Sequence, residues 1–178
     1  MSKTEHVLLG SGDLYLVEFS GEIPEEDETI ECPQNLVGGI KGGATLTYNA
    51  TLYTVVDDMR RFSQTIITGE EAIFKSGLLK WSLGDLARLT LTSRSSTDEA
   101  NAEIMKIGGK TAPKKTLARF VHTMGDGKKF RLTIVGTPAA GFELALVAEA
   151  ETILNAEFRA EPHDSEGTLI LIMKDTEE

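Results

Sequence analysis

The residues of this 178-residue chain that could do chemistry are few and stand far apart in the sequence. The three histidines, His6, His122 and His163, each lack a second plausible ligand at the spacing that metal sites use. The segment 161–167 holds His163 together with three acidic residues and a serine. Adjacent residues cannot supply the spatial geometry of a catalytic triad, so this segment is typical of a polar turn. We therefore expect no metal ligation and no triad.

The sequence also lacks the motifs of nucleotide-binding loops and the surroundings of a reactive thiol. Gly109-Lys110-Thr111 matches the end of a phosphate-binding loop, but the glycine required five positions earlier is Ile104. The glycine-rich segment 38–43 lacks the spacing of a dinucleotide site and is typical of turns. Cys32, beside Pro33 in an acidic loop, has no cationic neighbour that would stabilise a thiolate. The sequence predicts a protein that is not an enzyme and needs no cofactor or metal.

The overall charge argues against binding to polyanions. Apolar residues make up 40% of the chain and charged residues 26%, as in soluble globular proteins. The formal net charge of -10 disfavours attraction to nucleic acid or anionic lipid. The lone Cys32 cannot form an internal disulfide, and the apolar run 7–9 is far too short for a signal peptide. We expect synthesis in a reducing cytoplasm and no contact with a membrane.

Two segments carry opposite charge. Residues 22–31 contain only acidic charges, namely Glu22, Glu25, Glu26, Asp27, Glu28 and Glu31. Residues 114–131 are basic, with Lys114, Lys115, Arg119, Lys128, Lys129 and Arg131 against Asp126 alone. Such runs commonly form solvated surfaces. The alternative is that the two surfaces pair between neighbouring subunits, because a heterologous contact needs two different complementary patches.

The dominant hydrophobic period is two, which predicts strands. In 44–54, the apolar residues Leu46, Tyr48, Ala50 and Leu52 alternate with small polar ones, so the strand is expected to bury the apolar face and expose the polar one. Residues 153–161 follow the same pattern. The runs 115–124 and 128–135 flank Gly125-Asp126-Gly127 and predict a hairpin. Further strands are predicted at 13–19, 63–68, 70–76, 102–107, 142–148 and 167–174.

One helix is predicted at 82–91, where Ser82 can cap the first turn and Trp81 can pack against Leu86. Residues 20–43 and 93–101 are predicted as loops, and 1–6 as a flexible N-terminal arm. No change in composition marks a second domain, so residues 1–178 are expected to form one. Many strands with one helix predict a mainly β protein, an antiparallel β-sandwich or barrel with one flanking α-helix.

The order of several segments resembles the major tail tube proteins of phages that infect Gram-positive bacteria. The resemblance extends over 7–174. It is carried by 7–15, Gly38-Gly39, the strand 44–54, 74–81, 119–122, 127–136, 141–145 and 157–162.

This resemblance implies a β-sandwich whose copies form hexameric rings, with strands joining across subunits into a continuous inner β-barrel. Stacked rings would form a hollow tube in the virion tail, through which DNA passes without specific binding. The implied partners are a tape-measure protein and the tail terminator and distal tail proteins. The same fold serves contractile tails, phage-like bacteriocins and type VI secretion tubes, which remain alternatives. From a different class, a monomeric β-sandwich binding or baseplate module is also an alternative.

A lumen for DNA should carry small hydroxyls and carboxylates rather than Lys and Arg. The lumen candidates are Thr45, Thr47, Asn49, Thr51, Glu70 and Glu71, although a plain solvent face would show the same pattern. The candidates for contacts between rings are Glu25, Glu26, Asp27, Glu28, Lys128, Lys129 and Arg131. The segment 20–43 is expected to be mobile in the monomer and ordered in a tube.

Overall fold

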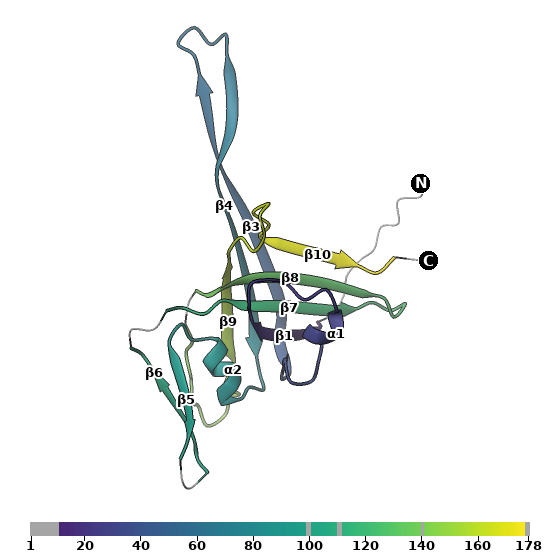
Figure 1. Cartoon of the computed structure of the whole chain (residues 1–178), viewed down its shortest axis with the longest axis vertical. Coiled ribbons are helices and arrows are strands. Elements are labelled where there is room, and N and C mark those ends of the chain that lie inside the picture. The colour runs from purple at the N-terminus through teal and green to yellow at the C-terminus, as the bar shows by residue number, and fades with distance from the viewer. Residues whose placement is uncertain (1–10, 99–100, 110–111, 140, 177–178) are drawn as a thin grey trace.

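The computed structural model describes residues 11–98, 101–109, 112–139 and 141–176. These residues form ten strands and two short helices (Figure 1). The elements are β1 (Asp13–Glu18), α1 (Asp27–Ile30), β2 (Leu36–Val37), β3 (Ile40–Val56), β4 (Ser63–Leu78), α2 (Leu83–Arg88), β5 (Ser93–Thr97), β6 (Glu103–Ile107), β7 (Thr116–Thr123), β8 (Lys129–Pro138), β9 (Leu154–Ala160) and β10 (Ile170–Lys174). The prediction of a mainly β protein with antiparallel pairing is confirmed.

The main sheet has the strand order β2-β1-β7-β8-β9-β4-β3, and β10 also pairs with β8. Strand β8 changes its partner along its length, because residues 130–134 pair with β10 and residues 136–138 pair with β9. In Figure 1, β1, β7, β8 and β10 cross β9, β4 and β3 at a steep angle. This arrangement is consistent with a β-sandwich. Strands β5 and β6 form a separate two-stranded sheet.

Gly136 lies where β8 passes from one partner to the other. A Cβ at this position would lie 2.0 Å from the backbone oxygen of Arg159 on β9. Real Cβ atoms do not approach a carbonyl oxygen so closely, so only glycine allows the two strands to meet here. The residue type at this one position therefore permits the bend of the sheet.

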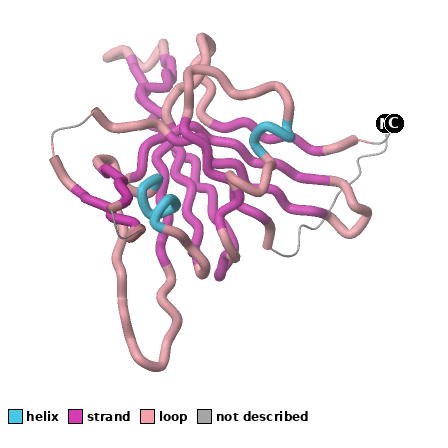
Figure 2. Tube along the Cα trace, turned by 60° about the horizontal axis from the view of Figure 1, so that its bottom comes forward, coloured by secondary structure: helices cyan, strands magenta, loops and turns pink. Residues whose placement is uncertain are grey.

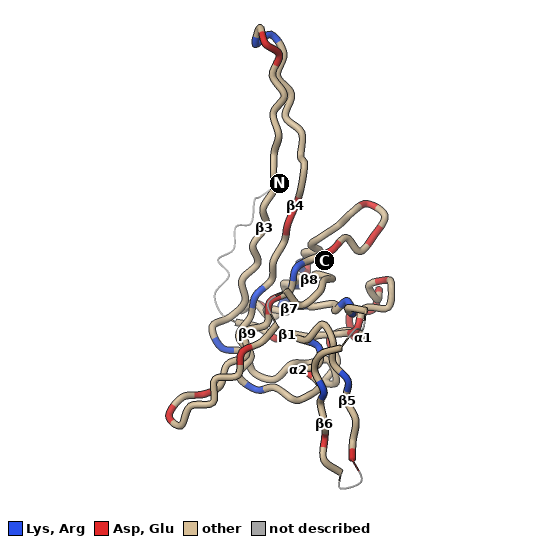
Figure 3. The backbone as a smooth tube through the Cα atoms, turned by 90° about the vertical axis from the view of Figure 1, so that its left-hand side faces the viewer, with Lys and Arg blue, Asp and Glu red and all other residues tan. Residues whose placement is uncertain are grey.

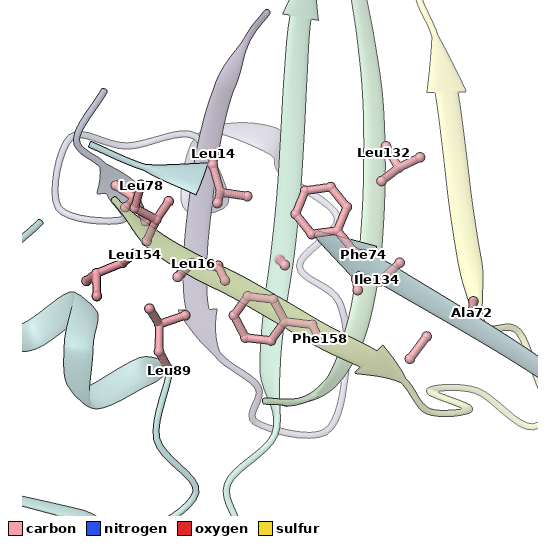
Figure 4. Packing of buried hydrophobic residues seen from close by; sticks show 14 of the residues in the cluster. Leu14, Leu16, Ala72, Phe74, Leu78, Leu89, Leu132, Ile134, Leu154 and Phe158 are labelled. Carbon is pink, nitrogen blue, oxygen red and sulfur yellow. The ribbon is translucent and has the colours of Figure 1, made fainter. Parts of the chain in front are cut away.

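The main core lies between the crossing halves of the sheet. Leu16 and Ile134 come from one half, and Phe74 and Phe158 come from the other. All four are buried, and Figure 4 shows their side chains gathered in one cluster, with Leu89 beyond the end of α2 at its side. Alternate residues of the strands point into this cluster, as the period of two predicts.

Helix α2 begins with the predicted cap. The Ser82 hydroxyl oxygen accepts a hydrogen bond from the Asp85 amide at 3.2 Å, and the Asp85 carboxylate accepts from the Ser82 amide at 2.9 Å. Two N–H groups of the first turn are thus satisfied reciprocally. The cap holds Leu86 and Leu89 against the main core.

The outer face of β1, β7 and β8 is covered by the chain itself. Ile30 of α1 is fully buried against Leu117 and Val135, and Val17 and Phe19 pack against the same cluster. This half of the sheet is therefore covered on both faces. Figure 2 shows α1 and α2 as separate short helices against different parts of the strands.

Three expectations about segments need correction. Residues 20–43 are not one loop, because they contain α1, β2 and the start of β3. Residues 93–97 form β5, a polar exposed strand without the hydrophobic alternation that would have predicted it. Residues 142–148 are not a strand, because they lie in the loop between β8 and β9, where the described residues form only the isolated bridge between Val147 and Ala150. The N-terminal arm 1–6 and residues 99–100 lie outside the described residues.

The other predicted strands are present. The hairpin is formed by β7 and β8. The segments 63–68 and 70–76 are parts of one continuous strand, β4, although Gly69 between them suggested a break. The predicted strand 44–54 lies within β3.

Candidate functional site

The β3–β4 hairpin leaves the body of the protein as a long ribbon (Figure 1). We call residues 47–70 the hairpin arm. Its strand residues, 47–56 and 63–70, are all exposed, and their only strand pairing is that between β3 and β4. A two-stranded ribbon of this kind is marginally stable in water by itself. The hairpin arm therefore has the character of a segment that another surface should cover.

The base of the hairpin arm has one polar face. The strand register places Asn49 opposite Glu71 and Thr45 opposite Lys75, and residues opposite each other share a face. Thr47 and Thr51 lie on this face by strand alternation. Five of the six lumen candidates are thus brought together, namely Thr45, Thr47, Asn49, Thr51 and Glu71.

Glu70, the sixth lumen candidate, lies on the opposite face. There it accepts a hydrogen bond from the Tyr48 hydroxyl, and this bond raises the pKa of Tyr48. The sequence pattern predicted that Tyr48 and Leu52 would be buried, but both are exposed. This prediction is wrong because the hairpin has already left the body at these residues.

The polar face continues onto β9, where charges are paired. Lys75 Nζ lies 2.8 Å from Glu157 Oε2, and Arg159 Nη2 lies 2.5 Å from Glu71 Oε1. Exposed pairs of this kind contribute at most about 1 kcal/mol each to stability. Their main consequence is that basic and acidic groups neutralise one another, so this face has little net charge.

The outer part of the hairpin arm is apolar on both faces. The register shifts between Thr51 and Leu52, and beyond that irregularity Leu52 faces Ile67 on one side of the ribbon. Tyr53 faces Ile66 on the other side. Leu52 is 61% exposed, Ile67 62% and Tyr53 58%. Contiguous exposed apolar side chains mark a binding surface.

The tip of the hairpin arm is a tight turn with two basic residues. The Asp57 carboxylate closes the turn by accepting from the Phe62 amide at 2.7 Å. Arg60 and Arg61 follow Met59 in the turn and are exposed. The tip thus combines exposed apolar groups, Met59 and Phe62, with exposed guanidinium groups.

Strand β3 forms the end of the main sheet, and the described residues contain no strand on its outer edge. It is 17 residues long, whereas β2 at the opposite end has only two residues. Long exposed edges offer unpaired N–H and C=O groups to another strand. β3 is therefore the part of the sheet best suited to pair with a second chain.

The acidic and basic segments meet within the chain. The Arg119 side chain is only 1% exposed, and its Nη1 donates to Asp27 Oδ1 at 2.5 Å. Its Nε donates to the Thr133 hydroxyl at 2.9 Å. Lys129 Nζ lies 2.7 Å from Glu31 Oε2, so the helix that covers β7 and β8 is also bonded to them by charge.

Among the candidates for contacts between rings, Asp27, Lys129 and Arg131 make ion pairs within one chain. Glu25, Glu26 and Glu28 are exposed beside this network, and Lys128 is half-buried. Unlike charges do pair as the sequence suggested, but inside a subunit. Contacts of these residues between rings stay a prediction.

Two carboxylates of the network have shifted pKa values. Burial disfavours the charged form of Glu31, but hydrogen bonds from Lys129 and Arg131 outweigh burial, and the pKa of Glu31 lies below its ordinary value. The Lys129 amide and then the Arg131 guanidinium lower the pKa of Asp175. These shifts describe a structural ion network.

The described part of the chain contains no cluster of three or more potential metal ligands. No helix within it is both long and apolar enough to span a membrane. His122 Nδ1 lies 2.7 Å from the Ser11 carbonyl oxygen, and Cys32 Sγ accepts from the side-chain amide Nδ2 of Asn35 at 3.0 Å. Both side chains therefore have local structural partners.

No protein-family model matches the chain, and no curated protein matches it. The hairpin arm is the feature that the sequence interpretation missed. A signal was present, because 52–56 and 62–67 are rich in apolar residues without strict alternation. Such runs are typical of strands that are covered on both faces.

Proposed function

We propose that this protein is the subunit of a hollow tube of the phage-tail type, built by self-assembly. The observation that carries the proposal is the hairpin arm, whose outer part exposes apolar side chains on both faces. A second copy is the simplest partner that would cover this surface in every molecule. Assembly would also remove the exposed edge of β3.

Within a ring, the edge of β3 would pair with a neighbouring subunit, so that strands continue from copy to copy around a barrel. The polar face at the base of the hairpin arm would then line the lumen. Its hydroxyl groups and internally paired charges offer DNA little to bind. This wall would permit a nucleic acid to slide.

The remaining features of the proposal come from the family resemblance. They are hexameric rings, assembly around a tape-measure protein with terminator and distal tail proteins at the ends, and a place in the virion tail. The net charge of -10 supports a conduit better than a DNA-gripping protein.

The test compares the purified protein with a variant of the hairpin arm by negative-stain electron microscopy and sedimentation velocity. We expect rings or tubes from the wild type. Ile66→Thr/Ile67→Thr should remain monomeric, because it removes apolar surface from both faces of the hairpin arm. Its free energy of unfolding should change by only about 0.5 kcal/mol, since both side chains are exposed.

Ile107→Thr is the matched control, because it makes the same chemical change at an exposed strand residue outside the hairpin arm. It should assemble as the wild type does. Discrete monomers from the wild type at every concentration would contradict the proposal. Normal tubes from the Ile66→Thr/Ile67→Thr variant would show that the hairpin arm is not the assembly surface.

A further inference from the structure

If subunits assemble as proposed, the tip of the hairpin arm needs a receiving surface. We infer that it docks on the loop 141–153 of the next copy along the long axis of the molecule. This inference rests on the proposed function and specifies which two surfaces of neighbouring subunits meet. It commits to a second copy of this chain as the partner.

The loop 141–153 connects β8 to β9 and projects from the body (Figure 2). It is held by the isolated bridge between Val147 and Ala150 and by the Thr152 hydroxyl, which donates to the Ala145 carbonyl at 2.9 Å. Leu146 in this loop is 82% exposed. The loop therefore offers an apolar surface on an already bent backbone.

Acidic charge distinguishes this loop from the other segments that expose apolar side chains. It contains Glu143, Glu149 and Glu151 and no basic residue. Glu151 pairs with Lys41, whereas Glu143 and Glu149 are exposed and have no ion pair within the described residues. The loop thus presents two uncompensated carboxylates beside Leu146.

The tip of the hairpin arm has the complementary character. Arg60 and Arg61 are exposed and make no ion pair among the residues that the structure describes. Met59 and Phe62 beside them are 69% and 54% exposed. Asp57 is used to close the turn, and Asp58 is a further exposed acidic residue of the tip. Arg60 and Arg61, beside apolar side chains, supply the two basic groups that can pair with the two carboxylates of the loop.

The two surfaces also lie in suitable places. In Figures 1 and 3 the tip is at one end of the longest axis, and the loop leaves the opposite half of the molecule. A copy displaced along this axis would bring its loop toward the tip of the first. Because the two surfaces differ, the contact is heterologous and can repeat without closing, as a growing tube requires. Apolar contact would supply affinity, and the charges would select the register.

The test is a charge exchange. Arg60→Glu/Arg61→Glu places acidic groups at the tip, and Glu143→Lys/Glu149→Lys places basic groups on the loop. Each variant alone brings like charges together, so each should require about tenfold or more higher concentration to form tubes. An equimolar mixture of the two should assemble at the wild-type concentration, because each contact then joins unlike charges. The variant with all four substitutions should do the same.

Glu166→Lys, at an exposed turn away from both surfaces, is the control for the change in net charge and should assemble normally. Circular dichroism should show that every variant is folded. The inference is overturned if Arg60→Glu/Arg61→Glu alone or Glu143→Lys/Glu149→Lys alone assembles like the wild type. It is also overturned if the mixture of the two variants does not restore assembly. Failure of the wild type itself to assemble would instead overturn the proposed function, and the inference with it.

Discussion

Nε of Arg131 on β8 lies 2.6 Å from Oε1 of Glu31, the residue that ends α1. Arg131 also donates from Nη1 to Asp175 Oδ1 at 2.5 Å. One side chain therefore links the sheet to the helix that covers it and to the segment after β10. The pairing explains how so acidic a helix can pack on a sheet that carries three basic residues.

Glu31→Gln should destabilise the protein. The neutral amide leaves Lys129 and Arg131 with a weaker partner in a site where the Glu31 side chain is nearly buried. Hydrogen bonds to charged groups contribute about 1.5 to 3 kcal/mol, so we expect a loss of about 2 kcal/mol in the free energy of unfolding. Urea denaturation measures this loss. Glu28→Gln, exposed on the same helix, should change stability little, and an equal loss in both variants would contradict the assignment.

The effect of Glu31 should depend on pH. Because the folded-state pKa of Glu31 lies below its ordinary value of 4.5, its contribution to stability is present above that value. The contribution is lost as the pH falls through the lower folded-state pKa. The stability difference between wild type and Glu31→Gln should therefore be constant near neutral pH and shrink below 4.5. A difference that stays constant down to the acid transition would show that the carboxylate charge is not responsible.

Local patterns predicted much of this fold because short-range physics determines them. The Gly125-Asp126-Gly127 turn between two apolar runs defined the β7–β8 hairpin, and Ser82 defined the start of α2. In each case the interacting residues are close in the sequence. Turn conformation and capping therefore sufficed to place these elements.

The candidate site was predicted less well, because it depends on contacts far apart in the chain. The sequence showed an acidic and a basic segment but not that Glu31 would meet Arg131 within one subunit. Alternation in β3 predicted a buried face for Leu52, yet burial depends on where the body ends. The alternation of side chains along a strand shows which of them share a face, but it does not show what covers that face.

Gly136→Ala should disrupt the bend of the main sheet. The added methyl group would lie 2.0 Å from the Arg159 carbonyl oxygen, a backbone atom that can move only if β9 moves. We expect a loss of about 3 kcal/mol, at the upper end for overpacking, or failure to fold. Gly125→Ala is the control, since a Cβ there would have nothing within 4 Å. Equal thermal stability of the two variants would show that the strands separate easily at this corner.

Amide hydrogen exchange should detect closure of the sheet in the assembled state. In the monomer, every second residue of β3 directs its N–H group away from β4, where the described residues offer no partner. If β3 pairs with a neighbouring subunit, those amides gain hydrogen bonds and should exchange much more slowly in tubes. Strand β7 is already paired with β1 and β8, so its amides should change little. The Glu31 amide, which donates to the Asp27 carbonyl at 2.7 Å beside the buried Ile30, should be protected in both states. Tubes in which β3 exchanges as fast as in the monomer would exclude pairing at this edge.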